Sequence, residues 1–181
     1  LVRAALDRLG TRPPGGQQLW ARVVAENRES DDHRVRPLEE RMARIFELPA
    51  TDDQLMSMVC SCFMKPIFLR GMAYSDTAPT LARIRKAGVR TALVSNTPWG
   101  SPANMWRAEL ARLGLDGLFD SVVFCRDVRL RKPDPAMVHR ALAEVDCEPA
   151  DALMIGDSDW DRGAAAAAGV DQCRADRHRL G

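Results

Sequence analysis

The C-terminal part of the chain alternates short apolar runs with longer stretches in which apolar residues recur every three or four positions. The short runs predict buried strands, and the periodic stretches predict amphipathic helices. Strand starts recur about every 30 residues, which is the length of a βαβ crossover and predicts a parallel sheet with helices on its faces. The strands are expected at residues 90–94, 121–124, 152–155 and 170–173.

Glycines and a proline mark the ends of the helices that are expected between these strands. Glycine just past the last apolar position is a frequent helix C-cap, and aspartate before proline is a frequent helix start. Helices should therefore end at Gly88, Gly114 and Gly169, and one should begin at Asp134-Pro135.

The N-terminal part has a different pattern, because its periodic segments contain no β-branched apolar run and are separated by proline and glycine. We predict a small all-helical unit over residues 1–71, with its boundary near Gly71, and an α/β unit over residues 72–181. The helical segments are expected at residues 1–10, 16–28, 36–47 and 52–64.

Composition and charge favour a small-molecule partner. The 181 residues are 46% hydrophobic and 28% charged, as in soluble globular proteins. The 26 basic and 25 acidic residues nearly cancel without long blocks, so neither nucleic acid nor an anionic membrane is expected as a partner. No apolar stretch approaches the roughly 20 residues of a membrane span, and the N-terminus lacks a signal-peptide pattern, which predicts a cytoplasmic location.

Cysteine and histidine give no sign of a metal cluster. The five cysteines are an odd number and include no C-x-x-C pair, which predicts reduced, mostly buried thiols and not a disulfide framework or a zinc site. The three histidines, His33, His139 and His178, are scattered along the chain and suggest neither a metal cluster nor a catalytic triad.

Polar side chains follow three successive strands. Ser95 and Asn96 follow the first strand, Lys132 lies in the loop after the second, and Asp157 and Asp161 follow the third. Ligands of α/β folds bind beyond the carboxyl ends of the strands, and a hydroxyl, a cation and carboxylates together suit phosphate and a divalent metal. Singly, the Ser-Asn pair could form a turn, the lysine could be a solvated charge, and the aspartates could cap the next helix.

Three stretches, "LVSNTPWG" at 93–100, "RKPDP" at 131–135 and "MIGDSDWDRGAAAAAGV" at 154–170, carry a resemblance to a known family. In this order and spacing they resemble motifs of the haloacid dehalogenase-like (HAD) hydrolase superfamily. The resemblance covers residues 73–181 closely, and the helical unit resembles the cap that one branch inserts after its first strand. It implies a three-layer, Rossmann-like core with a parallel sheet.

The resemblance also implies an activity, which is Mg²⁺-dependent hydrolysis of small-molecule phosphate monoesters through an aspartyl-phosphate. Ser95, with Asn96 beside it, would bind the transferring phosphoryl group, and Lys132 would neutralise the phosphate and the nucleophile. Asp157 would ligate Mg²⁺, with Asp161 supporting the metal site from close by. The cap would close over the substrate and select it.

The superfamily's first motif, D-x-D-x-[TV], which supplies the nucleophile, is absent from this sequence. The motif belongs upstream of the cap, so we expect it before Leu1 in a longer protein. The first core strand would then be missing from the middle of the sheet, and buried backbone groups beside it would lose partners.

Two alternatives stay open. A shortened protein could bind phosphate and metal without catalysis. A haloacid dehalogenase is the second alternative, although dehalogenases of the superfamily replace the Gly-Asp pair of the fourth motif with uncharged residues, whereas Gly156 and Asp157 keep it.

Overall fold

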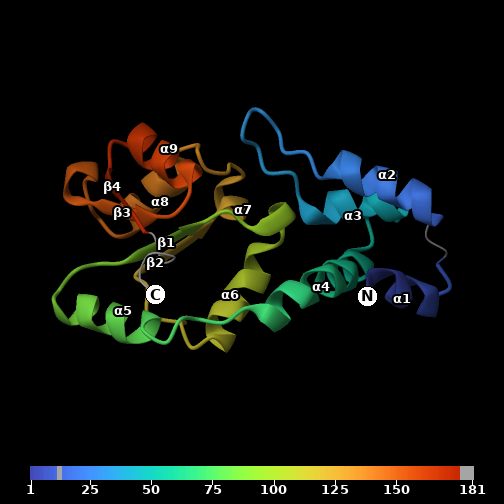
Figure 1. Cartoon of the computed structure of the whole chain (residues 1–181), viewed down its shortest axis with the longest axis horizontal. Helices are drawn as coiled ribbons and strands as arrows, with labels where there is room; N and C mark the ends of the chain where they lie inside the picture. The colour runs from blue at the N-terminus through green and yellow to red at the C-terminus, as the bar shows by residue number, and fades with distance from the viewer. Residues whose placement is uncertain (12–13, 176–181) are drawn as a thin grey trace.

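The computed structural model describes residues 1–11 and 14–175, which form a helical region and an α/β region (Figure 1). No helix among these described residues is long and apolar enough to cross a membrane. The helical region consists of α1 (Val2–Arg8), α2 (Gly16–Glu26), α3 (Leu38–Phe46) and α4 (Asp53–Arg70). The α/β region consists of α5 (Thr77–Lys86), β1 (Ala92–Ser95), α6 (Ala103–Arg112), β2 (Ser121–Phe124), α7 (Cys125–Val128), α8 (Ala136–Glu144), β3 (Leu153–Gly156), α9 (Asp159–Ala168) and β4 (Asp171–Arg174), with short 3-10 turns at Pro98–Gly100 and Pro149–Asp151.

The four N-terminal helices share one apolar core. In α3 the buried residues Leu38, Met42 and Ile45 recur at the spacing of one helix face, and they pack with Val59 and Met64 of α4. Helix α4 begins at an N-cap, since the Asp52 side chain accepts a hydrogen bond from Leu55 N at 2.9 Å. It continues past residue 64, where the sequence pattern placed the end of the segment, to Arg70.

The strands confirm the predicted α/β class but do not form one continuous sheet. β1 pairs in parallel with β2, and β3 pairs in parallel with β4, in two separate two-stranded sheets. The predicted strand at 121–124 matches β2, whereas the other three lie one or two residues later than predicted. The described strands thus form two parallel pairs, with a gap between β1 and β3.

Helix α8 joins the two small sheets. Its residues Met137 and Ala141 pack with Val123 of β2, while Val138 packs with Met154 of β3 and with α9. Helix α5, by contrast, has no buried residue, although it carries an apolar face. That face lines the gap between the sheets.

Loops of the helical region contact the chain just before Lys132. Val35 N donates to Arg129 O at 3.0 Å, and Arg131 N donates to His33 O at 2.9 Å. These bonds form a short antiparallel bridge between a loop of the helical region and the segment that leads to Lys132. The helical region therefore helps to position that segment.

The five cysteines are free thiols, as predicted, but the expectation that most are buried is wrong. Cys60 and Cys125 are buried, and burial raises the pKa of the Cys60 thiol to about 12. Cys62 and Cys147 are half-buried. Cys173 is exposed because all of β4 lies at the surface.

A pair of methionines tests the helical core. Met64 is fully buried, so Met64→Ala should lower the free energy of unfolding by about 2–5 kcal/mol through lost burial and the cavity that remains. Met72 is 85% exposed, and Met72→Ala should change it by less than about 0.5 kcal/mol. Urea denaturation followed by circular dichroism measures both variants, and equal losses would contradict the packing described for α4.

Candidate functional site

The structure brings Lys132, Asp161 and the end of β1 together. The ammonium of Lys132 lies 2.5 Å from Asp161 Oδ1 and donates a second hydrogen bond to Val94 O at 3.0 Å. Lys132 and Asp161 are both buried, at 8% and 7% exposure. This buried ion pair is the centre of the candidate site.

Asn96 holds the backbone of Lys132 and not its ammonium. Asn96 Oδ1 accepts from Lys132 N at 2.9 Å, and Asn96 Nδ2 donates to Lys132 O at 3.3 Å. Ser95, which ends β1, is half-buried, and its hydroxyl donates to Asn96 O at 3.2 Å. Asn96 therefore positions the loop, while the Ser95 hydroxyl lies beside it at the carboxyl end of the strand.

Asp161 also caps α9. Its Oδ2 accepts from Ser158 N at 3.0 Å and from Ser158 Oγ at 2.6 Å, and Asp161 N donates to Ser158 Oγ at 3.2 Å. This reciprocal pattern is a capping box, so the capping alternative is correct for Asp161. Burial raises the pKa of this carboxyl. The hydrogen bonds from Lys132 and Ser158 and the charge of Lys132 lower the pKa by more than burial raises it, so it lies below the usual value.

Two glycines allow this close arrangement. A Cβ on Gly156 would lie 2.5 Å from Asp161 Cβ and 2.6 Å from Asp161 Cγ. A Cβ on Gly163 would lie 2.8 Å from Pro133 Cβ, in the loop that carries Lys132. Without side chains at these two positions, α9 can approach both the end of β3 and that loop.

Asp157 lines the same space between β1 and β3 as Asp161 but differs from it in being exposed. Within residues 1–11 and 14–175, no three His, Cys, Asp or Glu side chains are grouped so that they could hold a metal ion. Both carboxylate oxygens of Asp161 already accept hydrogen bonds, one of them from a cation. The donor set fits Mg²⁺ held through one protein carboxylate, Asp157, since Mg²⁺ usually takes one or two carboxylates with water and substrate phosphates.

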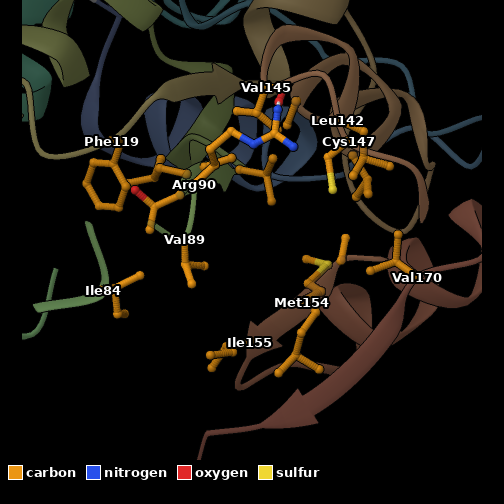
Figure 2. A pocket seen from close by; sticks show the side chains of 18 of the residues that line it. Ile84, Val89, Arg90, Phe119, Leu142, Val145, Cys147, Met154, Ile155 and Val170 are labelled. Atoms are coloured by element: carbon orange, nitrogen blue, oxygen red, sulfur yellow. Dashed lines mark hydrogen bonds between the residues drawn. The ribbon is translucent and has the colours of Figure 1, made fainter. Parts of the chain in front are cut away.

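A gap of about 1140 Å³ separates β1 from β3 (Figure 2). Lys132, Asp157 and Asp161 line it, whereas Ser95 and Asn96 are not among its lining residues. Most of the walls are apolar, and Ile155 in β3 is 66% exposed because it faces this space. The labelled apolar side chains around the gap are Ile84, Val89, Phe119, Leu142, Val145, Met154, Ile155 and Val170.

Both sides of the gap are sheet edges. Thr91 O points toward β2, because it accepts a hydrogen bond from Ser121 N. Backbone carbonyl groups alternate in direction along a strand, so Val94 O points toward the opposite edge of β1, where the ammonium of Lys132 donates to it. Gly156 O accepts from Ala175 N beyond β4, so the backbone groups of Ile155 point toward the gap. Among the described residues, no strand pairs with either of these edges. Both edges that face the gap are therefore open within residues 1–11 and 14–175.

A second, more polar cavity lies where α3 and α4 meet α6 and α7. It measures about 440 Å³, and none of the five predicted site residues lines it. Two of its lining residues form an ion pair, in which the guanidinium of Arg126 donates to both carboxylate oxygens of Glu39 at 3.0 Å. This cavity is therefore separate from the cluster around Lys132.

Two residues that hold the predicted ones in place, Ser158 and Trp99, were not among the predicted site residues. Ser158 fixes Asp161, and the S-x-x-D spacing of a capping box at 158–161 was the available signal. Trp99 follows Ser95 and Asn96 in the chain, and its ring contacts Phe63 at a centroid distance of 5.2 Å. The sequence carries no local signal for that contact, because it joins residues from different regions.

Comparison with known proteins decides the family. The family model of haloacid dehalogenase-like hydrolases matches residues 2–169, which is most of the chain and includes the first two motif stretches and residues 154–169 of the third. The chain belongs to the haloacid dehalogenase-like hydrolase family. The predicted resemblance is thus confirmed.

Relatives with different activities match this haloacid dehalogenase-like chain. "Pyrophosphatase PpaX" of Bacillus velezensis is 36% identical over 97 residues, covering 54% of this chain and 43% of the relative. "(S)-2-haloacid dehalogenase 4A" of Burkholderia cepacia is 30% identical over 105 residues, covering 58% of this chain and 44% of the relative. The chain thus aligns with less than half the length of these two curated relatives, a pyrophosphatase and a dehalogenase.

A solved structure agrees in fold. The HAD phosphatase from Thermococcus onnurineus superimposes with a TM-score of 0.62 at 24% identity, covering 89% of this chain and 67% of that one. The match extends over the helical and the α/β regions and supports the predicted fold class.

Gly156→Ala tests the approach of α9 to β3. The added methyl group would overlap the Asp161 side chain, so the free energy of unfolding should fall by about 1–3 kcal/mol. Gly16→Ala is the control, because a Cβ there meets nothing within 4 Å and a helical alanine is favoured over glycine by up to about 1 kcal/mol. Chemical denaturation measures the free energy of unfolding of both variants. If Gly156→Ala leaves this free energy unchanged, the Asp161 side chain is not confined.

Acid should weaken the contribution of Asp161 to stability. Because its folded pKa is lowered, this contribution is fully present above the unfolded pKa of about 3.9 and is lost as the pH falls through the lower folded value. The difference in unfolding free energy between the wild type and Asp161→Asn should therefore be constant above about pH 5 and shrink below about pH 4. Denaturation series across this range measure it; a difference that does not change with pH would exclude an ionised, bonded carboxylate.

Proposed function

We propose that the longer protein containing this chain is a Mg²⁺-dependent hydrolase of small-molecule phosphate monoesters that works through an aspartyl-phosphate. The observation that carries this proposal is the cluster at the strand ends. The buried ammonium of Lys132 contacts Val94 O, next to Ser95 at the carboxyl end of β1. The exposed carboxylate of Asp157 lines the same gap between β1 and β3 as Lys132 does.

Each of these residues has a task in that reaction. The Ser95 hydroxyl donates a hydrogen bond to a phosphoryl oxygen of the substrate. Lys132 holds positive charge beside the phosphate, and Asp161 and Asn96 keep its side chain and backbone in place. Bound Mg²⁺, held through Asp157, would supply charge stabilisation for the phosphoryl oxygens.

The nucleophile must come from outside the described chain. Covalent catalysis needs an activated group next to the phosphorus, whereas the Ser95 hydroxyl donates to a backbone oxygen, Asn96 O, and not to a base. We place the nucleophilic aspartate at the end of a strand that precedes Leu1 and fills the gap between β1 and β3. Its carboxylate would then emerge beside Lys132 and Asp157.

The helical region would act as the substrate-selecting cap. We assign residues 1–71 to the cap and residues 72–181 to the core, although residues 12–13 and 176–181 lie outside the described structure. Support comes from Trp99, which extends from the loop after Ser95 to Phe63 and lies 5.5 Å from the guanidinium of the buried Arg41. Through this loop the cap is in contact with the phosphate-binding strand end.

An assay of the protein with its upstream segment tests the function. We expect Mg²⁺-dependent hydrolysis of p-nitrophenyl phosphate by that protein and none by residues 1–181 alone. Halide release from 2-chloropropionate without metal would favour the dehalogenase alternative, for which the Burkholderia cepacia relative gives a reason. Phosphate and Mg²⁺ binding without turnover would favour a non-catalytic binding protein.

Asp157→Asn tests the proposed metal ligand. In the protein with its upstream segment, this change should weaken Mg²⁺ binding by about tenfold or more, because it removes the charged oxygen ligand. Asp159→Asn is the matched control, since Asp159 is exposed in the same turn and pairs with Arg162 at the surface. Calorimetric titration with Mg²⁺ measures both, and equal affinities would refute the assignment.

A further inference from the structure

We propose that Glu29, in the loop between α2 and α3, is a positioning residue for Lys132. Its carboxylate contacts two guanidinium groups, those of Arg41 and Arg131. Arg131 directly precedes Lys132, and Arg41 lies over the ring of Trp99 in the loop that follows β1. These contacts form a link between the loop of Lys132 and the loop that follows β1. The catalytic effect of the link rests on the proposed function, whereas the link itself can be measured without any chemical step.

One oxygen atom of Glu29 serves both arginines. Glu29 Oε2 lies 2.8 Å from Nη2 of Arg41 and 3.7 Å from Nε of Arg131. Two guanidinium groups that share one oxygen atom are close enough to repel each other, and the carboxylate between them offsets this repulsion. Loss of the negative charge should therefore move the two arginine side chains apart.

Arg41 is the fixed end of the link, because it is fully buried. Its guanidinium also donates to Arg36 O at 3.1 Å and to Glu26 O at 2.5 Å. Burial lowers the pKa of the Arg41 guanidinium, and the charge of Glu29 raises it. A buried group with two further acceptors has little freedom to move when the charge of Glu29 is lost.

Trp99 carries the link into the loop that follows Ser95. Its φ of +55° is uncommon for a residue with a bulky side chain. The ring contacts Phe63 at a centroid distance of 5.2 Å and lies 5.5 Å from the guanidinium carbon of Arg41. Contacts from the helical region thus help to maintain this backbone conformation.

Arg131 is the movable end of the link. The loop between α2 and α3, which extends toward the α/β region (Figure 1), holds it at three points. Besides the contact with Glu29, Arg131 Nη2 donates to Ser30 O at 2.8 Å, and Arg131 N donates to His33 O at 2.9 Å. Within the described part of the chain, no hydrogen bond reaches the buried Nε of Arg131. The attraction of Glu29 therefore acts on an atom that no hydrogen bond holds.

A shift of Arg131 would reach Lys132 through the backbone. Lys132 N donates to Asn96 Oδ1 at 2.9 Å, and the ammonium donates to Asp161. Both bonds require the backbone of Lys132 to stay in place. A misplacement of a catalytic group by about 1 Å can cost about a hundredfold in rate, so a small shift of this loop would reach the proposed reaction.

Hydrogen exchange measures the link in the full-length protein as its host produces it. Glu29→Gln keeps the size of the side chain and removes its charge. In NMR experiments, the exchange rates of the hydrogen-bonded amides of Arg131 and Lys132 should rise about three- to tenfold. The amide of Val123, which points toward β1, should not change. Unchanged rates at Arg131 and Lys132 would overturn the proposal.

A second ion pair between the two regions provides the control. Glu39 pairs with Arg126 of α7, and its side chain is 32% exposed, compared with 36% for Glu29. Glu39→Gln thus removes a similarly accessible charge from the contact between the regions, but away from Lys132. It should leave the exchange of the Arg131 and Lys132 amides unchanged. An effect as large as that of Glu29→Gln would overturn the proposal, because any loosening of the contact would then suffice.

Kinetics of the full-length protein with p-nitrophenyl phosphate test the catalytic effect. A misplaced Lys132 ammonium stabilises the transition state less well, so Glu29→Gln should lower kcat about tenfold and raise KM by less than about twofold. Glu40→Gln, which removes a surface charge paired with Arg44, should change neither constant. A role of Glu29 confined to folding would leave kcat of the folded variant unchanged, and that result would overturn the positioning role.

A double variant shows whether Glu29 acts through Arg131. Arg131→Met removes the guanidinium at the movable end, so Glu29 has no charge to attract there. Glu29→Gln added to Arg131→Met should therefore lower kcat further by less than about twofold. Two effects that multiply as independent changes would overturn the link.

The exchange and kinetic results separate this proposal from the proposed function. Local changes in exchange in a full-length protein without phosphatase activity would overturn the proposed function and leave the link in place. Phosphatase activity together with unchanged exchange in Glu29→Gln would overturn the link alone.

Discussion

The buried ammonium of Lys132 links the two halves of the α/β region. It donates to a carbonyl at the edge of β1 and to Asp161, the first-turn aspartate of the helix that follows β3. Loss of one partner of a buried ion pair leaves an uncompensated charge, which commonly costs about 3–5 kcal/mol. The absence of side chains at Gly156 and Gly163 allows this contact, so the site and the local fold depend on the same few positions.

The second link between the halves is apolar. One side of α8 packs on β2 through Met137, and another packs toward β3 through Val138. Two-stranded sheets have little stability of their own and depend on such packing. The polar link through Lys132 and the apolar link through α8 together hold β1 and β3 on either side of an open, apolar space. We place the carboxylate of the proposed nucleophile in this space.

The helical region contributes to the site by contact with loops. A loop of this region bonds the segment just before Lys132, and Trp99 packs on Phe63 and near Arg41. Gly100, next to Trp99, lies so close to Arg36 O that a Cβ would be 2.3 Å from that oxygen. The two loops that carry the predicted phosphate-binding residues are therefore held from the side on which a substrate-selecting cap would lie.

The sequence by itself determined the order of helices and strands, the α/β class and the strand-end position of Ser95, Lys132 and Asp157, because apolar periodicity and capping signals are local. The predicted strands lie within two residues of those observed. Only the tertiary structure decided that Asp161 pairs with Lys132 and that Asn96 holds a backbone. It also decided that the strands form two separate pairs. Both side-chain contacts join residues that are far apart in the chain, and the Lys132–Asp161 pair also depends on how closely α9 approaches β3.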